Sequence, residues 1–253
     1  MRAIPRTLTA FAIIAALAGL RPGTPALAHD PSLHQAPSAR QTPAAAVFER
    51  TSQFDYDPPE PGTYELPALR RAGDGAVLDT TGARRLLGDV FKNHIVLFSL
   101  IYSLCGDANG CPLATATLYD IFNASARDPD LARALRLVSL SFDPARDTPA
   151  AIAEYAAPLR AAGGGGDKSE WIFLTTESES ALAPILDGYD QVVSKRASSE
   201  KTTPGVLDHI LYVYLIDRAG QVRNIYTLAF LDPRLIVADI KTLLLESGRT
   251  ARQ

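Results

Sequence analysis

A run of apolar residues from His94 to Tyr102 (HIVLFSLIY) constrains the fold more than any other part of the chain. Nearly all of its residues are aliphatic or aromatic, which is typical of a central strand buried on both faces of a parallel sheet. The run leads directly into the loop SLCGDANGCP, in which Pro112 follows a cysteine. Proline suits the first turn of a helix, because its missing N–H group would have no partner there. The sequence therefore predicts a strand, a cysteine loop and a helix in immediate succession.

The same alternation of strands and helices continues to the end of the chain. A short strand between two turns is predicted within 73–82, and further strands at 136–142, 171–175, 210–216 and 222–226. Helices are predicted at 112–122, 149–159, 178–186 and 233–245. The segment from Asp217 to Gly220 is a hairpin signal between the last two strands. Strand–helix units followed by a hairpin and a final helix are the order of a thioredoxin-like fold. We therefore expect an α/β protein with a central mixed sheet flanked by helices.

The N-terminus carries the features of an export signal. Arg2 and Arg6 precede an apolar run, and Ala26-Leu27-Ala28 fits a cleavage site for signal peptidase. The apolar run, 8–20, is too short to span about 30 Å of hydrocarbon. We expect 1–28 to be a secretory signal peptide that directs the protein to the periplasm or an equivalent space. If the signal is not cleaved, it would attach the protein to the membrane.

A tether and one folded domain are predicted after the signal. Residues 29–61 are rich in Ala, Pro, Gln and Ser and have neither helical nor strand periodicity. Such a segment is expected to be a disordered tether, followed by a thioredoxin-like domain at 62–248.

The charge balance disfavours nucleic acid as a partner. The chain has 25 Lys and Arg against 28 Asp and Glu. Three of the arginines lie in the predicted signal, which has no acid, so the remainder carries a net charge of −6. An acidic body is better suited to cationic ligands or to other proteins.

The two cysteines of the chain, Cys105 and Cys111, lie in the predicted loop. Outside the cytosol such a pair is most often a structural disulfide. A disulfide across so short a loop would constrain little unfolded-chain entropy, so redox or metal chemistry is the better interpretation. Cys111 is expected at a helix N-terminus, where the helix dipole favours the thiolate. Gly106 and Gly110 give the loop the freedom to bring the two sulfur atoms together.

A histidine near the cysteines would extend the possible chemistry. His209 precedes the strand predicted at 210–216, which a thioredoxin-like domain brings beside the cysteine loop. Two thiolates suit Cu(I), and an added imidazole would make a mixed site for Cu(I) or Cu(II). The same cysteines could instead cycle between dithiol and disulfide, and their spacing does not distinguish these alternatives. The only methionine is Met1, which excludes copper storage on a thioether cluster.

Three segments together resemble the Sco/SenC family of thioredoxin-like copper chaperones. SLCGDANGCP resembles the family loop, in which proline follows the second of two cysteines. LSFDPARDTPAAIAEYA (140–156) is similar to a D-P-x-x-D-T-P signature between a strand and a helix. DHILYVYLIDRAGQV (208–222) resembles the family segment that begins with Asp-His. The resemblance covers residues 64–245.

The resemblance implies a metallochaperone rather than an enzyme in the strict sense. Cys105, Cys111 and His209 would bind copper, as Cu(I) or Cu(II), and Asp208 would orient the imidazole or remain a solvated acid. The implied partners are a membrane respiratory complex such as cytochrome c oxidase, or its copper-centre subunit, and a thiol reductant of the same compartment. Asp107 would be a loop acid able to influence the metal.

Two further acids, Asp143 and Asp147, are expected to have structural roles, as a turn residue and a helix cap. The cysteine loop departs from the family pattern, because five residues separate the cysteines where three are usual. The longer loop would change the geometry with which the two sulfur atoms bind copper. The identity of the protein that receives the copper therefore stays open.

The alternative function is a thiol–disulfide oxidoreductase that acts on the cysteines of a partner protein. It would use Cys105 and Cys111 as a redox pair and would not need His209. The CxxC spacing of most such enzymes is absent. A peroxidase is disfavoured because no Pro and Thr stand shortly before a cysteine, and the absence of C-x-x-C-H excludes covalent haem attachment.

Overall fold

The computed structural model describes residues 48, 54–161, 167–195 and 207–250. The predicted signal peptide lies outside these residues, as does most of the predicted tether. No helix in the described ranges is long and apolar enough to cross a bilayer.

An eight-stranded sheet forms the centre of the molecule, with the strand order β1-β10-β9-β4-β5-β6-β2-β3. β4, β5 and β6 are parallel, whereas β9 is antiparallel to β4 and β2 is antiparallel to β6. The α/β class and the mixed thioredoxin-like sheet are therefore confirmed. The strands of the sheet are β1 (Arg70–Arg71), β2 (Ala76–Asp79), β3 (Arg84–Leu86), β4 (Ile95–Ile101), β5 (Leu135–Ser141), β6 (Glu170–Thr175), β9 (Val213–Ile216) and β10 (Gln221–Tyr226).

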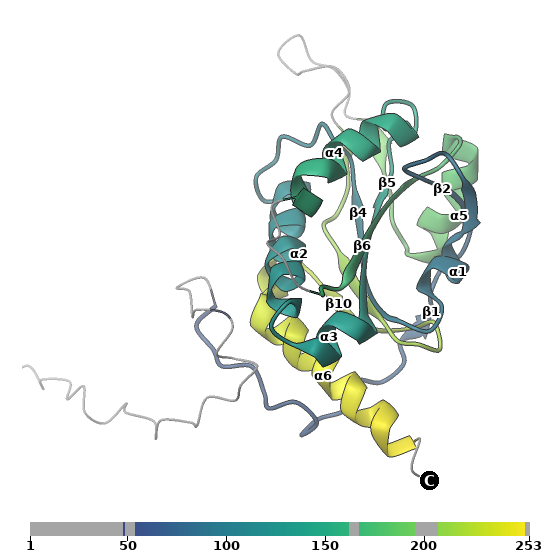
Figure 1. Cartoon of the computed structure of the whole chain (residues 1–253). Helices are drawn as coiled ribbons and strands as arrows, with labels where there is room; N and C mark the ends of the chain where they lie inside the picture. Colours follow the sequence, from purple (N-terminus) through teal and green to yellow (C-terminus); the bar gives the residue numbers. More distant parts are fainter. Residues whose placement is uncertain (1–47, 49–53, 162–166, 196–206, 251–253) are drawn as a thin grey trace, which may run out of the picture. The chain divides into compact units, whose positions relative to one another are not determined.

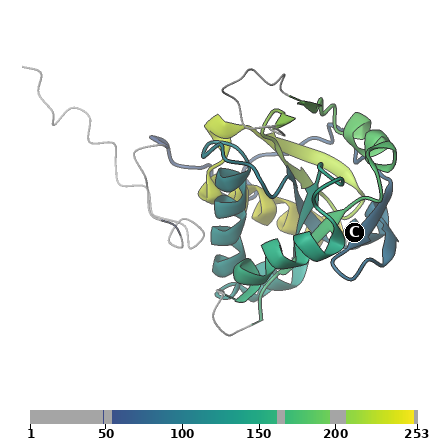
Figure 2. The same ribbon diagram turned by 90° about the horizontal axis from the view of Figure 1, so that it is seen from above.

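Helices cover both faces of the sheet (Figures 1 and 2). α2, α3, α4 and α6 lie on one face, and α1 and α5 lie on the other. The right-handed crossovers between the parallel strands β4, β5 and β6 run in one direction, which places α2, α3 and α4 on the same face. The helices are α1 (Leu87–Phe91), α2 (Cys111–Ser125), α3 (Pro129–Ala134), α4 (Pro149–Ala161), α5 (Glu179–Gly188) and α6 (Pro233–Thr250).

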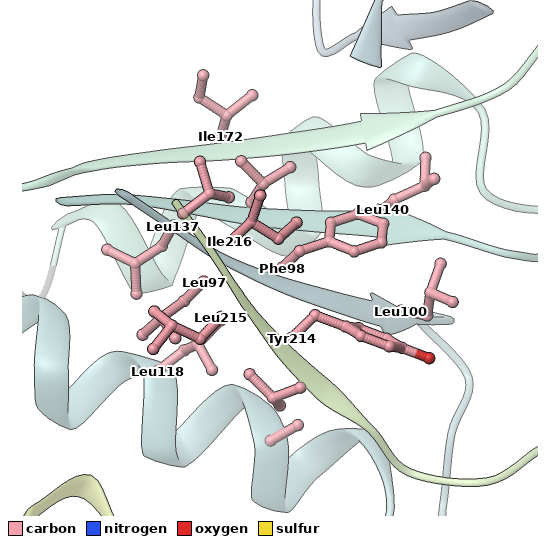
Figure 3. Packing of buried hydrophobic residues seen from close by; sticks show 14 of the residues in the cluster. Leu97, Phe98, Leu100, Leu118, Leu137, Leu140, Ile172, Tyr214, Leu215 and Ile216 are labelled. Carbon is pink, nitrogen blue, oxygen red and sulfur yellow. The ribbon is translucent and has the colours of Figure 1, made fainter. Parts of the chain in front are cut away.

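The core consists of two apolar layers, one on each face of the sheet (Figure 3). Leu97 and Leu215 lie on the face that α2 covers, close to Leu118. Phe98 lies on the opposite face, and its ring centroid is 4.7 Å from that of Tyr189. Every residue of β4 is buried, as expected for a strand that is covered on both faces.

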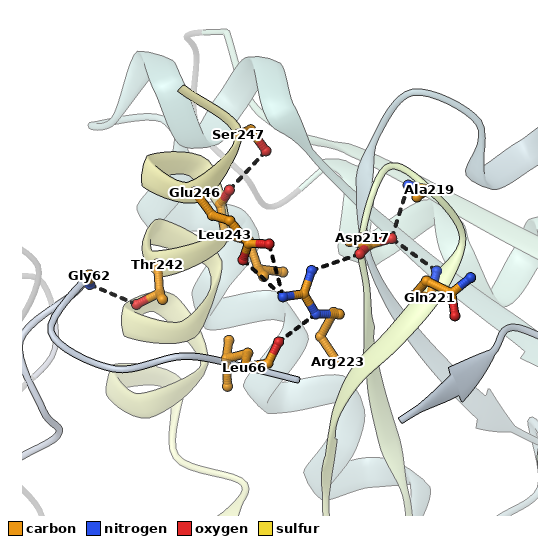
Figure 4. A network of polar contacts seen from close by, with 10 residues as sticks. All are labelled: Gly62, Leu66, Asp217, Ala219, Gln221, Arg223, Thr242, Leu243, Glu246 and Ser247. Atoms are coloured by element: carbon orange, nitrogen blue, oxygen red, sulfur yellow. Dashed lines mark hydrogen bonds and ion pairs between the residues drawn. The ribbon is translucent and has the colours of Figure 1, made fainter. Parts of the chain in front are cut away.

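An ion-pair network fixes β10 against α6 (Figure 4). The Arg223 guanidinium lies 2.8 Å from the carboxylates of both Asp217 and Glu246, and it donates to the Leu66 carbonyl at 2.6 Å. Its side chain is 12% exposed, so these contacts are largely shielded from solvent. The network therefore joins the hairpin, the last helix and the chain that precedes β1.

The end of the predicted tether packs against the domain. Phe54 is buried, and its carbonyl accepts a hydrogen bond from Arg234 of α6 at 3.1 Å. Arg234 also pairs with the buried Asp232 at 2.8 Å. Phe54, which belongs to the predicted tether, is therefore attached to α6.

The strand predicted at 210–216 is shorter than expected. β9 begins at Val213, whereas Ile210 is 62% exposed. The residues just before it, β8 (Leu207–Asp208), pair instead with β7 (Ser194–Lys195) in a separate two-stranded sheet. The segment between β8 and β9 is therefore free of ladder pairing, and it carries His209.

Candidate metal or redox site

The three predicted ligands lie at the end of the sheet where β4 finishes and β9 begins. β4 and β9 are antiparallel neighbours, with Ser99 opposite Val213. This pairing brings the segment before β9 beside the loop after β4. The Sγ atom of Cys111 lies 3.8 Å from Nε2 of His209. Two of the three predicted ligands are therefore in contact, although 98 residues separate them.

Cys105 lies in the loop between β4 and α2, and its thiol is free, as is that of Cys111. A Cβ atom added to Gly110 would lie 3.3 Å from the Cys105 sulfur. The glycine therefore leaves space that the sulfur needs. The first residue of α2 is Cys111, which is 1% exposed, whereas Cys105 is only half-buried.

Both cysteines line one cavity of about 490 Å³. Its walls come mainly from α2 and α4 and are largely apolar, with aromatic and aliphatic side chains. The other residues of the lining are Tyr102, Ser103, Pro112, Thr115, Ala116, Tyr119, Tyr155, Pro158 and Leu159.

The three side chains do not form a closed metal cluster. In the part of the chain that the structure describes, no group of three or more His, Cys, Asp and Glu residues is arranged to hold a metal ion. Cys105 lies close to Cys111, because its charge and a side-chain hydrogen bond with it contribute to the raised pKa of the Cys111 thiol.

Aromatic rings hold the imidazole of His209. Its ring centroid is 4.6 Å from that of Phe142 and 6.2 Å from that of Tyr102. Burial lowers the pKa of His209, while the charges of Asp107 and Asp208 act in the opposite direction. Burial therefore favours the neutral imidazole, the form that can bind a metal.

The environment of Cys111 differs from the expectation. Burial raises the pKa of its thiol, and the neighbouring Cys105 raises it further, although a backbone hydrogen bond opposes this shift. Desolvation of the thiolate thus outweighs the favourable position at the helix N-terminus. The burial of Cys111, which is 1% exposed, is the physical reason.

The acids near the site have separate roles. Asp107 accepts a hydrogen bond from the backbone N–H of Asn109 at 3.0 Å, which shapes the cysteine loop. Asp143 is a turn residue as expected, because its carbonyl oxygen accepts a hydrogen bond from the backbone N–H of Arg146. Its carboxylate also pairs with the Arg146 guanidinium at 2.8 Å.

Asp147 is not the cap of α4, and that prediction is wrong. The hydroxyl of Thr148 accepts the hydrogen bond from the backbone N–H of Ala151 at 3.3 Å. The Asp147 carboxylate is instead directed away from the helix, toward Ser103 and Ser141. The sequence pattern D-T-P could not show which of its two polar residues would cap the helix.

Sequence reasoning also missed the two rings that hold His209. Tyr102 and Phe142 directly follow β4 and β5, which are parallel neighbours. An aromatic residue just after each of two adjacent parallel strands was the available signal, because both strand ends meet at one edge of the sheet. His94 lies just before β4, at the opposite end of the strand from the cysteine loop.

Solved structures of several Sco proteins are similar to this chain. ScoI of Bradyrhizobium japonicum with copper bound is 22% identical, with a TM-score of 0.54, and the match covers 68% of this chain and 99% of that one. Yeast Sco1 with copper bound is 21% identical, with a TM-score of 0.52 and coverage of 74% and 96%. BsSco is 22% identical, with a TM-score of 0.50 and coverage of 70% and 95%.

The comparisons by sequence give one match and one negative result. A search of curated proteins found no match. The sequence model of the SCO1/SenC family matches residues 76–245, which run from β2 into α6 and include both cysteines and His209. Since this match spans more than half of the residues, the chain belongs to the SCO1/SenC family.

Proposed function

We propose that this protein is a copper chaperone that works outside the cytosol and delivers its copper to a respiratory complex such as cytochrome c oxidase. Family membership supports the general role. The similar ScoI of B. japonicum and yeast Sco1 have copper bound, and BsSco is described as a member of the Sco family of cytochrome c oxidase assembly proteins. The sequence of residues 1–28 supports export, as a cleaved signal or as a membrane anchor.

The observation that carries the proposal is the 3.8 Å separation between the Cys111 sulfur and Nε2 of His209. Typical lengths of about 2.3 Å for a metal–thiolate bond and about 2.0 Å for a metal–imidazole bond give roughly 3.5 Å between sulfur and nitrogen at a tetrahedral centre. The two atoms therefore need to move very little to share one metal ion. Cys105 would close the site from the loop.

The ligand set suits a protein that must both hold and release copper. Two thiolates favour Cu(I), and the imidazole extends the site to Cu(II). The thiolate, not the thiol, binds the metal, so copper binding displaces the thiol proton of each cysteine. Because Cys105 is half-buried in a glycine-containing loop, it is the ligand that a recipient could replace first.

Copper titration of the reduced, purified protein tests this proposal. Wild type is expected to bind one equivalent of Cu(I), and one of Cu(II) with sulfur-to-copper charge-transfer absorption. The variants Cys105→Ser and Cys111→Ser should each lose that absorption. A wild-type protein that binds no copper when fully reduced would rule out the chaperone.

A second candidate is a thiol–disulfide oxidoreductase. The two free thiols on one cavity favour it, and BsSco has been described as containing a disulfide switch. This function would need both cysteines and a thiol reductant, but it would not need His209. Catalysed reduction of a mixed-disulfide substrate at the same rate by wild type and His209→Ala would support this candidate over the chaperone.

A further inference from the structure

The carboxylate of Asp147 is buried behind the cysteine loop and is 1% exposed. Its Oδ2 atom accepts hydrogen bonds from the backbone N–H of Ser103 at 3.0 Å and from the hydroxyl of Ser141 at 2.5 Å. Its Oδ1 atom accepts from the hydroxyl of Ser103. An ionised carboxylate only accepts hydrogen bonds, so this one side chain fixes the direction of all three donors.

The first of these partners belongs to the turn that carries Cys105. Ser103 stands two residues before Cys105, and the backbone N–H of Cys105 donates to the Tyr102 carbonyl at 3.2 Å. Ser103 is therefore inside a tight turn with the cysteine at its end. The hydrogen bonds that fix Ser103 to Asp147 therefore also fix the backbone position of Cys105.

The second partner leads to His209. Ser141 is the last residue of β5 and lies opposite Ile101, the last residue of β4. The next residue, Phe142, donates its backbone N–H to the Ile101 carbonyl at 2.9 Å, and its ring packs against His209. Asp147 thus contacts both the turn before Cys105 and the strand end that supports the imidazole.

A plain structural connector does not explain the residue type. Burial of a carboxylate among neutral donors costs free energy that a neutral connector would avoid. The helix start does not need it, because Thr148 already caps α4. The side-chain hydrogen bonds of Asp147 all lead to the site.

We infer that Asp147 is a positioning residue, which sets the place of the Cys105 thiol relative to Cys111 and His209 through its hydrogen bonds to Ser103 and Ser141. The consequence for copper binding rests on the proposed function, whereas the consequence for the dithiol–disulfide equilibrium of the two cysteines is independent of it. Loss of the carboxylate should therefore change both copper binding and the stability of the Cys105–Cys111 disulfide.

Two substitutions at Asp147 separate the contributions of its hydrogen bonds. Asp147→Ala removes all three, whereas Asp147→Asn keeps the side-chain volume and can still accept from the Ser103 N–H. The control is Asp143→Asn, in the same turn, whose carboxylate pairs with Arg146 and does not contact Ser103. Each variant is first compared with wild type by circular dichroism and urea unfolding.

The measurements are the Cu(II) affinity with its charge-transfer spectrum, and the equilibrium of the metal-free cysteine pair with a reducing dithiol. Asp147→Ala should lower Cu(II) affinity about tenfold or more, as for other residues that orient metal ligands, and shift the dithiol equilibrium. Asp147→Asn should have a smaller effect. Asp143→Asn should leave the Cu(II) affinity and the dithiol equilibrium constant within about twofold of wild type, well short of the tenfold change expected for Asp147→Ala.

A folded Asp147→Ala variant with unchanged copper affinity and unchanged dithiol equilibrium would overturn the inference. If that variant does not fold, Ser103→Ala and Ser141→Ala decide the question, because each removes one hydroxyl donor. Unchanged values in both would then overturn it. If wild type binds no copper, the proposed function fails, while the dithiol equilibrium still tests the role of Asp147.

Discussion

Nε2 of His209 lies 3.8 Å from the sulfur of Cys111, and neither group is fully exposed to solvent. The contact depends on the antiparallel pairing of β4 with β9, which places the segment before β9 beside the first turn of α2. The sheet thus holds two groups at nearly the separation that one metal ion requires, and the third predicted ligand comes from the cysteine loop.

Replacement of His209 by alanine should weaken Cu(II) binding much more than Cu(I) binding. The imidazole is the ligand that suits Cu(II), whereas two thiolates suffice for Cu(I). We expect a loss of Cu(II) affinity of at least about a hundredfold, beyond the effect of outer-shell changes, measured by competition with a chelator. The control is His94→Ala, at the opposite end of β4, which should bind both ions as wild type does. Equal Cu(II) affinities for the two variants would remove His209 from the site.

Gly110→Ala should disturb the site, whereas Gly106→Ala should not. A methyl group at Gly110 would stand 3.3 Å from the Cys105 sulfur and from the Asp107 carbonyl oxygen, so the sulfur must shift. A methyl group at Gly106 would meet no atom within 4 Å. We expect Gly110→Ala to lower Cu(II) affinity about tenfold and to shift the charge-transfer band, since ligand placement governs affinity. Matching spectra for the two variants would contradict this.

Arg223→Met should destabilise the domain without affecting copper. The change leaves the carboxylate of Asp217, which is 14% exposed, without its cation. We expect the free energy of unfolding in urea to fall by about 2–3 kcal/mol, less than for a fully buried pair because Glu246 reaches solvent. The control is Arg84→Met, whose pair with Glu177 is well exposed and should cost less than about 1 kcal/mol. Equal decreases in the free energy of unfolding for the two variants would show that the network around Arg223 stabilises the domain no more than an exposed ion pair does.

The stability of the protein should fall as the pH drops below about 6.5, and His94 should contribute to this fall. Burial lowers the pKa of His94 and the Arg136 charge lowers it further, with Glu170 opposing. Its Nδ1 atom is buried without a hydrogen-bond partner. Below its ordinary pKa the unfolded chain binds the proton first, so the stabilisation is complete above that pH and is lost as the pH falls through the lower, folded-state pKa.

Urea unfolding of wild type and His94→Gln between pH 7.5 and 5.5, a range that brackets the ordinary histidine pKa of about 6.5, measures this effect. Wild type should lose more stability than the variant over that range. His209, whose pKa is also lowered, remains in both proteins and contributes equally. Parallel pH profiles would show that His94 titrates normally in the folded state.

The sequence allowed the central elements of the fold to be predicted, because their signals are local. The apolar run that begins at His94 gave β4, and Pro112 marked the start of α2. The beginning of β9 was misplaced because Ile210, although apolar, is exposed beside the β7–β8 pair. Hydrophobicity alone does not reveal where a strand leaves its sheet.

The site could be predicted only in part. Cys105, Cys111 and His209 each lie next to a predicted strand, which was enough to predict that they meet at one edge of the sheet. The raised pKa of Cys111 was not foreseeable, because it depends on how deeply the folded domain buries the thiol. The role of Asp147 was missed because its partners lie on the ends of other strands.

The two edge strands of the sheet share an unusual composition. β1 is Arg70–Arg71 alone, and β3 begins with Arg84 and Arg85. Free strand edges invite pairing with another chain, and short, positively charged edges oppose it. Both free edges of the sheet are thereby protected from adding strands of a second copy, so encounters between copies should not lead to fibrous aggregation through the sheet.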